Sequence, residues 1–191
     1  MKGPVYWHPW LYEQAMRRLY GARGFDERYE AVASQIPPGA DVVDLCAGDG
    51  RLRHYLPKGT PYTAVDLNAA FLRRLSGDGV KTVVANLRET IPQGGCVVMM
   101  AALYHFVPDH AALVRRAIAA ASQRFILTEP VTNVTNSGPA LLARVSAWVS
   151  DPGDGSGDQR LTTADLEQLL GDVPGGTVTH RSREWVMVWD R

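Results

Sequence analysis

The sequence lacks several features that mark common classes of protein. It has only two cysteines among 191 residues, Cys46 and Cys96, and each lies in an apolar run. Two cysteines cannot build the disulfide framework of a small secreted protein, which indicates a reducing compartment. Charge of one sign is also missing, because 20 Lys and Arg balance 20 Asp and Glu. A neutral chain without a basic run lacks the usual electrostatic attraction to nucleic acid or to an anionic membrane.

Long hydrophobic runs are absent as well. The longest covers residues 96–103, far short of the roughly 20 residues that a membrane span needs. Pro4 and Pro9 interrupt the N-terminal stretch where a signal peptide would be apolar. We therefore expect a cytoplasmic protein with no membrane span and no nucleic-acid partner.

The residues that are present predict an α/β protein. Hydrophobic residues make up 46% of the chain and charged residues 21%, which is typical of one globular domain at this length. Strand-like and helix-like segments alternate after residue 40, and this alternation predicts βαβ units and a parallel sheet. The expected strands are residues 41–45, 62–66, 80–85, 95–101 and 124–129, and the expected helices are residues 50–56, 68–75 and 108–122.

The two ends of the chain differ from this middle part. Residues 9–35 predict two helices broken at residues 21–24, with many aromatic side chains in and before them. Near the C-terminus, residues 163–170 predict a helix with a Thr162/Asp165 capping box. The last segments, residues 177–181 and 184–190, predict two strands joined too tightly for a crossover helix, hence an antiparallel pair. Between these ends we expect a helix at residues 139–149 and a polar loop at residues 151–158, whose Asp spacing does not match a calcium loop, so no metal site is expected.

The most informative stretch is residues 44–50, Asp-Leu-Cys-Ala-Gly-Asp-Gly, between a predicted strand and a predicted helix. Gly48 and Gly50 allow the backbone to approach a ligand closely, and the following helix offers free N–H groups at its N-terminus. Asp66 ends the second strand, sixteen residues after Gly50. In a doubly wound sheet this carboxylate lies beside the first turn, within reach of a ribose.

Nicotinamide cofactors fit this layout poorly. They require G-x-G-x-x-G, but the residues after Gly50 include no third small residue. Asp49 would also lie next to the pyrophosphate, which is electrostatically unfavourable. The stretch instead resembles the first motif of the class I S-adenosylmethionine-dependent methyltransferases, an acidic residue followed by G-x-G-x-G. Cys46 stands at the first glycine position, a substitution that this family admits.

Later segments are similar to the family's other motifs, in the same order along the chain. These segments are YTAVDLN, VVANLRETIP, MMAALYHF, ILTEP and the terminal strand pair, so that the resemblance covers about residues 6–190. It implies a doubly wound, Rossmann-like α/β fold with a seven-stranded sheet of order 3-2-1-4-5-7-6, an antiparallel last strand pair and helices on both faces. It also implies one methyltransferase domain over residues 1–191, with cap helices in residues 1–36 and a core in residues 37–191 that binds S-adenosylmethionine.

The resemblance assigns roles to individual residues. Asp66 is expected to bind the ribose, Leu67 to lie beside the adenine, and Asp44 to hold the first loop and the methionine amino group. Either Asn86 or Leu87 is expected at the adenine edge, although Asn86 could instead cap the next turn. The other residues expected around the cofactor are Cys46, Ala47, Gly48, Gly50 and Ala101, together with Tyr12 and Tyr20, whose hydroxyls could reach the methionine carboxylate.

Tyr104 and His105 are the candidate catalytic residues, because they follow the fourth strand where the methyl group would lie. A histidine can accept a proton near neutral pH, but both side chains could equally pack under the next helix. Glu129 and Pro130, at the end of the fifth strand, are further candidates for contact with substrate or cofactor.

Methyl transfer can depend mainly on proximity and orientation, so it needs no strong catalytic constellation, and the sequence contains none. The aromatic N-terminus and zero net charge favour a small, partly apolar methyl acceptor. A methyltransferase acting on a macromolecule such as protein or RNA is the alternative, and a non-catalytic protein that binds S-adenosylmethionine is another. The sequence leaves the acceptor atom open, and it allows a monomer or a homodimer.

Overall fold

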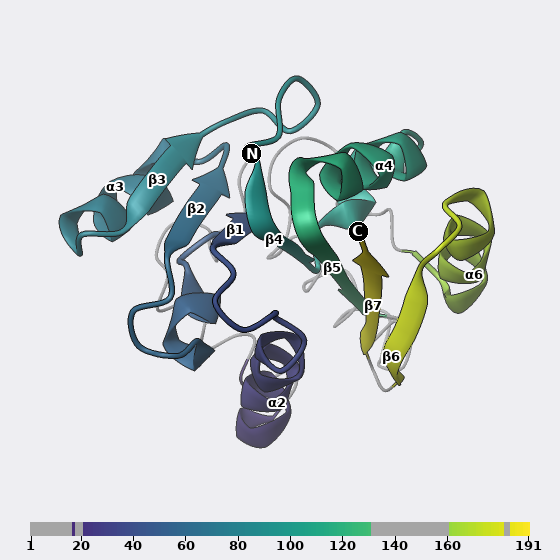
Figure 1. Cartoon of the computed structure of the whole chain (residues 1–191), viewed down its shortest axis with the longest axis horizontal. Helices are drawn as coiled ribbons and strands as arrows, with labels where there is room; N and C mark the ends of the chain where they lie inside the picture. Colours follow the sequence, from purple (N-terminus) through teal and green to yellow (C-terminus); the bar gives the residue numbers. More distant parts are fainter. Residues whose placement is uncertain (1–16, 18–20, 131–160, 182–183) are drawn as a thin grey trace, which may run out of the picture.

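The structure is a computed structural model that describes residue 17 and residues 21–130, 161–181 and 184–191 (Figure 1). Tyr12, Tyr20, the helix expected at residues 139–149 and the loop at residues 151–158 lie outside the described residues. The boundary between a cap and a core near residue 36 therefore stays a prediction.

Seven strands of the described chain form one sheet with the order β3-β2-β1-β4-β5-β7-β6. The parallel strands are β1 (Val42–Leu45), β2 (Tyr62–Asp66), β3 (Lys81–Val84), β4 (Gly94–Met100) and β5 (Ala121–Pro130). The antiparallel strands are β6 (Thr177–Arg181) and β7 (Glu184–Asp190), and β7 lies between β5 and β6. The predicted strand order and the antiparallel last pair are confirmed.

Helices cover both faces of this sheet (Figure 1). Helix α2 (Ala22–Ala33) packs on one face, against apolar side chains of β1, β4, β5 and β7. Helices α4 (His110–Ala120) and α6 (Thr163–Asp172) pack on the other face, and α3 (Ala69–Gly77) packs beside β2 and β3. Because β4 is covered on both faces, its apolar run is buried on both, as expected of a central parallel strand.

Two of the described helices begin with a side-chain cap. The Asn68 side chain accepts a hydrogen bond from the N–H of Ala70 at 3.1 Å and starts α3. Thr162 and Asp165 form the expected capping box at the start of α6. Each cap satisfies a backbone N–H that has no partner within the helix.

Two helices differ in detail from the sequence prediction. The segment after Gly50 is a short 3-10 helix, η2 (Arg51–Tyr55), rather than the start of an α-helix. The helix break expected at residues 21–24 lies at Gly21, which has φ 74°, because α2 begins at Ala22 and runs through Gly24. Phe25 and Tyr29 of α2 are buried against the sheet, and this packing outweighs the low helix propensity of one glycine.

Candidate functional site at the carboxyl edge of the sheet

The loop after β1 has an unusual backbone conformation. Cys46, Gly48 and Gly50 all have positive φ, at 56°, 56° and 67°. At Gly50 a Cβ would lie 2.9 Å from a methyl carbon of Leu75, so a larger residue does not fit without a shift. Cys46 adopts a left-handed conformation that glycine takes at little cost, at the position where the sequence motif has its first glycine.

Asp66 links the end of β2 to this loop. Its Oδ2 accepts a hydrogen bond from the N–H of Gly48 at 2.9 Å, and its Oδ1 accepts one from the N–H of Asn68 at 2.7 Å. The N–H of Ala47 donates to the carbonyl of Val65 at 3.0 Å, which joins the same loop to β2 a second time. The sequence predicted that Asp66 and the first loop are neighbours, and the structure brings them together.

Asp44 is a buried carboxyl beneath the loop. Its Oδ2 accepts a hydrogen bond from the Tyr62 hydroxyl at 2.5 Å. Burial, followed by the nearby charges of Asp66 and Asp49, raises the pKa of Asp44 from 3.8 to about 7, although the Tyr62 hydrogen bond opposes the shift. A cationic group placed beside this carboxyl would therefore favour its ionised form and lower its pKa. Tyr62 was not expected at the site from sequence, because its side chain reaches Asp44 only through the pairing of β1 with β2, in which Tyr62 lies opposite Val42.

The Cys46 thiol does not have the character of a nucleophile. Burial and the carboxylates of Asp66, Asp44 and Glu129 raise the pKa of Cys46 well above its usual value. The sulfur therefore stays protonated near neutral pH, and a thiol is a poor nucleophile. This agrees with its expected place as a small residue of the loop.

The carboxyl ends of β2 and β3 expose apolar side chains. Leu67 is 71% exposed and Val84 is 60% exposed, whereas Leu87 is buried. The sequence motifs pointed to Leu67 but not to Val84, since the exposure of an apolar residue at the end of an edge strand depends on what covers it. Asn86 caps the turn after β3: its Oδ1 accepts from the N–H of Arg88 at 3.1 Å. This is the capping role that the sequence had left open as an alternative to adenine binding.

The turn after β4 carries the candidate catalytic residues in the short helix η3 (Leu103–Phe106). Ala101, with φ 50°, leads into it, and the N–H of Ala101 donates to the carbonyl of Thr128 at 2.8 Å. Tyr104 is buried among core residues that include those of α4, and its ring centroid lies 3.9 Å from that of the half-buried His105. Packing under α4 therefore accounts for Tyr104, and its contact with a substrate stays a prediction.

Glu129 supports this turn from the neighbouring strand. It is buried, and its Oε1 accepts a hydrogen bond from the N–H of Leu103 at 2.6 Å. The carboxyl ends of β1, β2, β4 and β5 thus bring Asp44, Asp66, His105 and Glu129 to one edge of the sheet.

Other site types are not found in the described residues. These residues contain no group of three or more His, Cys, Asp or Glu side chains that could hold a metal ion. No described helix combines the length and the apolar character needed to cross a membrane. A shallow groove of about 440 Å³ lies at the amino edge of the sheet, where β4 and β5 begin, and its lining includes Asp41, Gln93 and Arg191 but none of the candidate residues.

Comparison with known proteins yields structural neighbours only. No protein-family model matches this sequence, and no curated protein matches it at a significant level. Magnesium protoporphyrin IX methyltransferase from Synechocystis PCC 6803, solved with bound SAH, is 16% identical with a TM-score of 0.66 over 92% of each chain. A cyclopropane synthase from Mycobacterium tuberculosis is 16% identical, with a TM-score of 0.64 over 83% of this chain and 63% of its own. A 16S rRNA methyltransferase from T. thermophilus, in complex with AdoMet and guanosine, is 16% identical, with a TM-score of 0.55 over 85% of this chain and 38% of its own.

The structural neighbours are class I S-adenosylmethionine-dependent methyltransferases, the family that the sequence motifs resemble. Their likeness extends to the strand order and to the antiparallel strands at the end of the sheet. The chain therefore has the fold of the class I S-adenosylmethionine-dependent methyltransferases.

Proposed function

We propose that this protein transfers a methyl group from S-adenosylmethionine to a small, partly apolar acceptor. The observation that carries the proposal is the contact between the Asp66 carboxylate and the N–H of Gly48, in a loop with three left-handed residues. An acidic strand end held against a glycine-containing loop suits the ribose of an adenosine cofactor. The fold and the ligands named for its structural neighbours support the same cofactor.

The residues present fit this ligand in two ways. A Cβ added at Gly48 would meet nothing within 4 Å, so the loop is open on that side to a closely approaching molecule. The exposed side chains of Leu67 and Val84 offer apolar surface for an adenine ring near Asp66. In this proposal Asp66 accepts hydrogen bonds from the ribose hydroxyls, and Asn86 or Leu87 lies at the adenine edge.

The methionine end of the ligand would lie toward β1 and β4. Asp44 is suited to a cationic amino group, because such a group favours the ionised form of a carboxyl whose pKa is about 7. The backbone near Ala101 would line the methionine arm, and Cys46, Ala47 and Gly50 shape the loop. Tyr12 and Tyr20 stay predicted partners of the methionine carboxylate.

When bound, S-adenosylmethionine supplies an electrophilic methyl group on a sulfonium sulfur. The turn after β4 would position the acceptor and exclude water, and positioning of this kind can lower a barrier by roughly 7–11 kcal/mol in favourable cases. His105 is the candidate base that takes a proton from an O–H or N–H group of the methyl acceptor. Tyr104 would pack beside His105 and hold that side of the acceptor site in place. An acceptor without such a proton would need no base.

The small-molecule acceptor rests on zero net charge and on neighbours such as the magnesium protoporphyrin IX methyltransferase. The rRNA methyltransferase among the neighbours favours a macromolecular acceptor as the second candidate. A cytoplasmic location and a monomeric or homodimeric state are part of the same proposal.

Transfer of a labelled methyl group separates these functions. The protein is incubated with methyl-labelled S-adenosylmethionine and, in separate reactions, with small hydroxylated aromatic compounds, total RNA or total protein. Label in a small product supports the proposal, and label in RNA or protein supports the second candidate. Binding of the ligand without transfer to any fraction would instead indicate a non-catalytic binding protein.

A further inference from the structure

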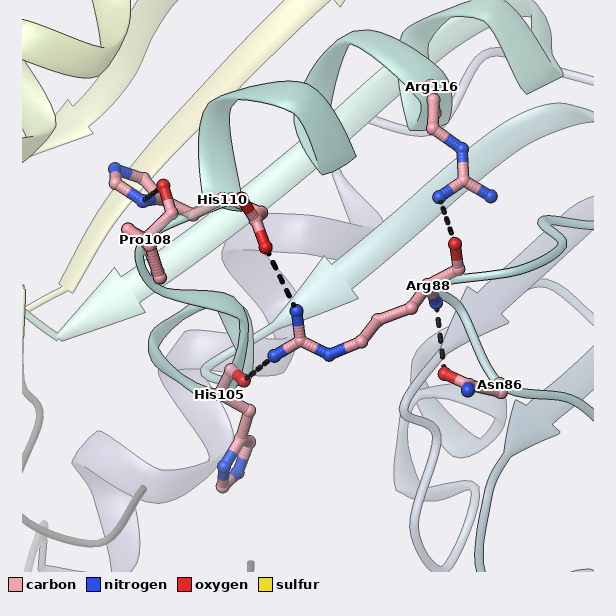
Figure 2. A network of polar contacts seen from close by, with 7 residues as sticks. Asn86, Arg88, His105, Pro108, His110 and Arg116 are labelled. Atoms are coloured by element: carbon pink, nitrogen blue, oxygen red, sulfur yellow. Dashed lines mark hydrogen bonds and ion pairs between the residues drawn. The ribbon is translucent and has the colours of Figure 1, made fainter. Parts of the chain in front are cut away.

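Arg88 connects two turns that belong to different parts of the proposed site (Figure 2). Its backbone lies in the turn after β3, and its guanidinium reaches the turn after β4. One guanidinium nitrogen donates to the carbonyl oxygen of His105 at 2.9 Å, and the other lies 3.5 Å from Oδ2 of Asp109. The guanidinium carbon also lies 5.3 Å from the centroid of the Phe106 ring.

The backbone of Arg88 is itself held on both sides. Its N–H donates to Oδ1 of Asn86 at 3.1 Å, and its carbonyl accepts from the Arg116 side chain of α4 at 2.8 Å. The side chain therefore extends from a fixed base. Because the Arg88 backbone is anchored in this way, its side-chain contact with His105 fixes the position of the turn after β4 relative to the turn after β3.

The turn after β4 is held at both of its ends. Glu129 accepts the N–H of Leu103 at the start of η3, and Arg88 donates to the carbonyl of His105 near its end. In Figure 2 the imidazole of His105 points away from Arg88, and the hydrogen bond from Arg88 is made to the backbone carbonyl of His105.

The contact with the His105 carbonyl matters more than the ion pair with Asp109. The Asp109 side chain is 73% exposed and that of Arg88 is 47% exposed, and an ion pair between exposed groups contributes little. The planar guanidinium can serve two acceptors at once, in fixed directions, which a lysine ammonium cannot do in the same way.

We propose that Arg88 is a positioning residue of the methyl-transfer site. It fixes the turn that carries Tyr104 and His105 relative to the turn after β3, where the adenine is proposed to lie. One side chain then fixes the position of the acceptor end of the site relative to its cofactor end. This inference rests on the proposed function.

The test follows the His105 imidazole by NMR on protein labelled with 13C-histidine. The His105 signal is assigned by its absence in His105→Asn, and the probe ligand is S-adenosylhomocysteine (SAH). In the wild type, saturating SAH is expected to shift the His105 signal. In Arg88→Met, which keeps the aliphatic stem, the ligand-induced shift is expected to fall to less than half, while the dissociation constant measured by calorimetry changes less than about threefold.

Arg115→Met is the matched control. Arg115 lies next to Arg116 on α4 and donates to the carbonyl of Asp172 at 2.7 Å, so its loss removes a similar hydrogen bond away from the turn. This variant should keep the full shift of the His105 signal. If Arg88→Met does not fold, Arg88→Lys replaces it, with a shift expected between those of the wild type and zero.

The outcomes separate the inference from the proposed function. Failure of the wild type to bind SAH contradicts the proposed function and the inference with it. Binding of SAH without any response of the wild-type His105 signal overturns the inference alone. An undiminished ligand-induced shift of the His105 signal in the folded Arg88 variant also overturns the inference. Equal losses of this shift in the Arg88 and Arg115 variants would overturn it as well, because they would assign the effect to a general loosening of α4.

Discussion

Replacement of Asp44 by asparagine should remove a pH dependence of stability that arises from one buried carboxyl. The asparagine side chain has nearly the same shape and can still accept the hydrogen bond from Tyr62, but it cannot ionise. In the wild type, the pKa of Asp44 is raised from 3.8 to about 7 in the folded state, mainly by burial. A raised carboxyl pKa means that the folded state binds the proton more tightly than the unfolded state, so stability falls as pH rises between the two values.

The magnitude follows from the size of the shift. About 3 pKa units at 1.36 kcal/mol per unit correspond to roughly 4 kcal/mol in total. Of this, roughly 2.5 kcal/mol should be lost between pH 5 and pH 8. Between pH 5 and pH 8 the unfolding free energy of Asp44→Asn is therefore expected to rise by roughly 2.5 kcal/mol relative to that of the wild type.

Urea denaturation of both proteins at half-unit steps from pH 5 to pH 8 measures this difference. Asp172→Asn, which changes an exposed carboxylate at the end of α6, is the control and should show a constant difference from the wild type. A constant difference for Asp44→Asn would mean that the buried carboxyl keeps one charge state across the range. That result would refute the reasoning from burial.

Two further changes test the loop and a helix end. Gly48→Ala should fold, because its Cβ meets nothing within 4 Å, and its φ of 56° should cost about 1 kcal/mol of stability. Its affinity for SAH should fall at least tenfold in calorimetry, whereas Gly77→Ala should bind SAH normally. Equal affinities of the two variants would contradict the proposed close approach of the ligand to Gly48. Thr162→Ala removes a capping box in which Asp165 is the partner, and should lower the unfolding free energy in urea by about 1 kcal/mol. Thr163→Ala, one residue later, should cost less, and equal losses would show that the cap contributes nothing of its own.

The sequence predicted those parts of the fold that depend on local pattern and on motif order. The short segments ending at Leu45 and Asp66 are strands as expected, and the two C-terminal strands pair as their tight connection required. The proximity of Asp66 to Gly48 followed from the topology of a doubly wound sheet, in which the carboxyl ends of adjacent parallel strands lie at the same edge.

Features that depend on side chains far apart in the sequence could not be predicted. The hydrogen bond from Arg88 to His105 spans 17 residues, and the one from Leu103 to Glu129 spans 26. Both depend on the distance between turns and on the side-chain conformations that packing selects. The continuity of α2 through Gly24 likewise depends on tertiary burial, which local propensity does not contain.

The most direct test of the central claim is a calorimetric titration of the wild type and Asp66→Ala with SAH. We predict one site in the wild type and an affinity lower by roughly 5- to 150-fold in Asp66→Ala, equivalent to about 1–3 kcal/mol for loss of a charged hydrogen-bonding group. Asp78→Ala, which removes a surface carboxylate paired with Arg53, should bind like the wild type. Absence of binding to the wild type would contradict the proposed function, and an unchanged affinity in Asp66→Ala would contradict the proposed ribose site.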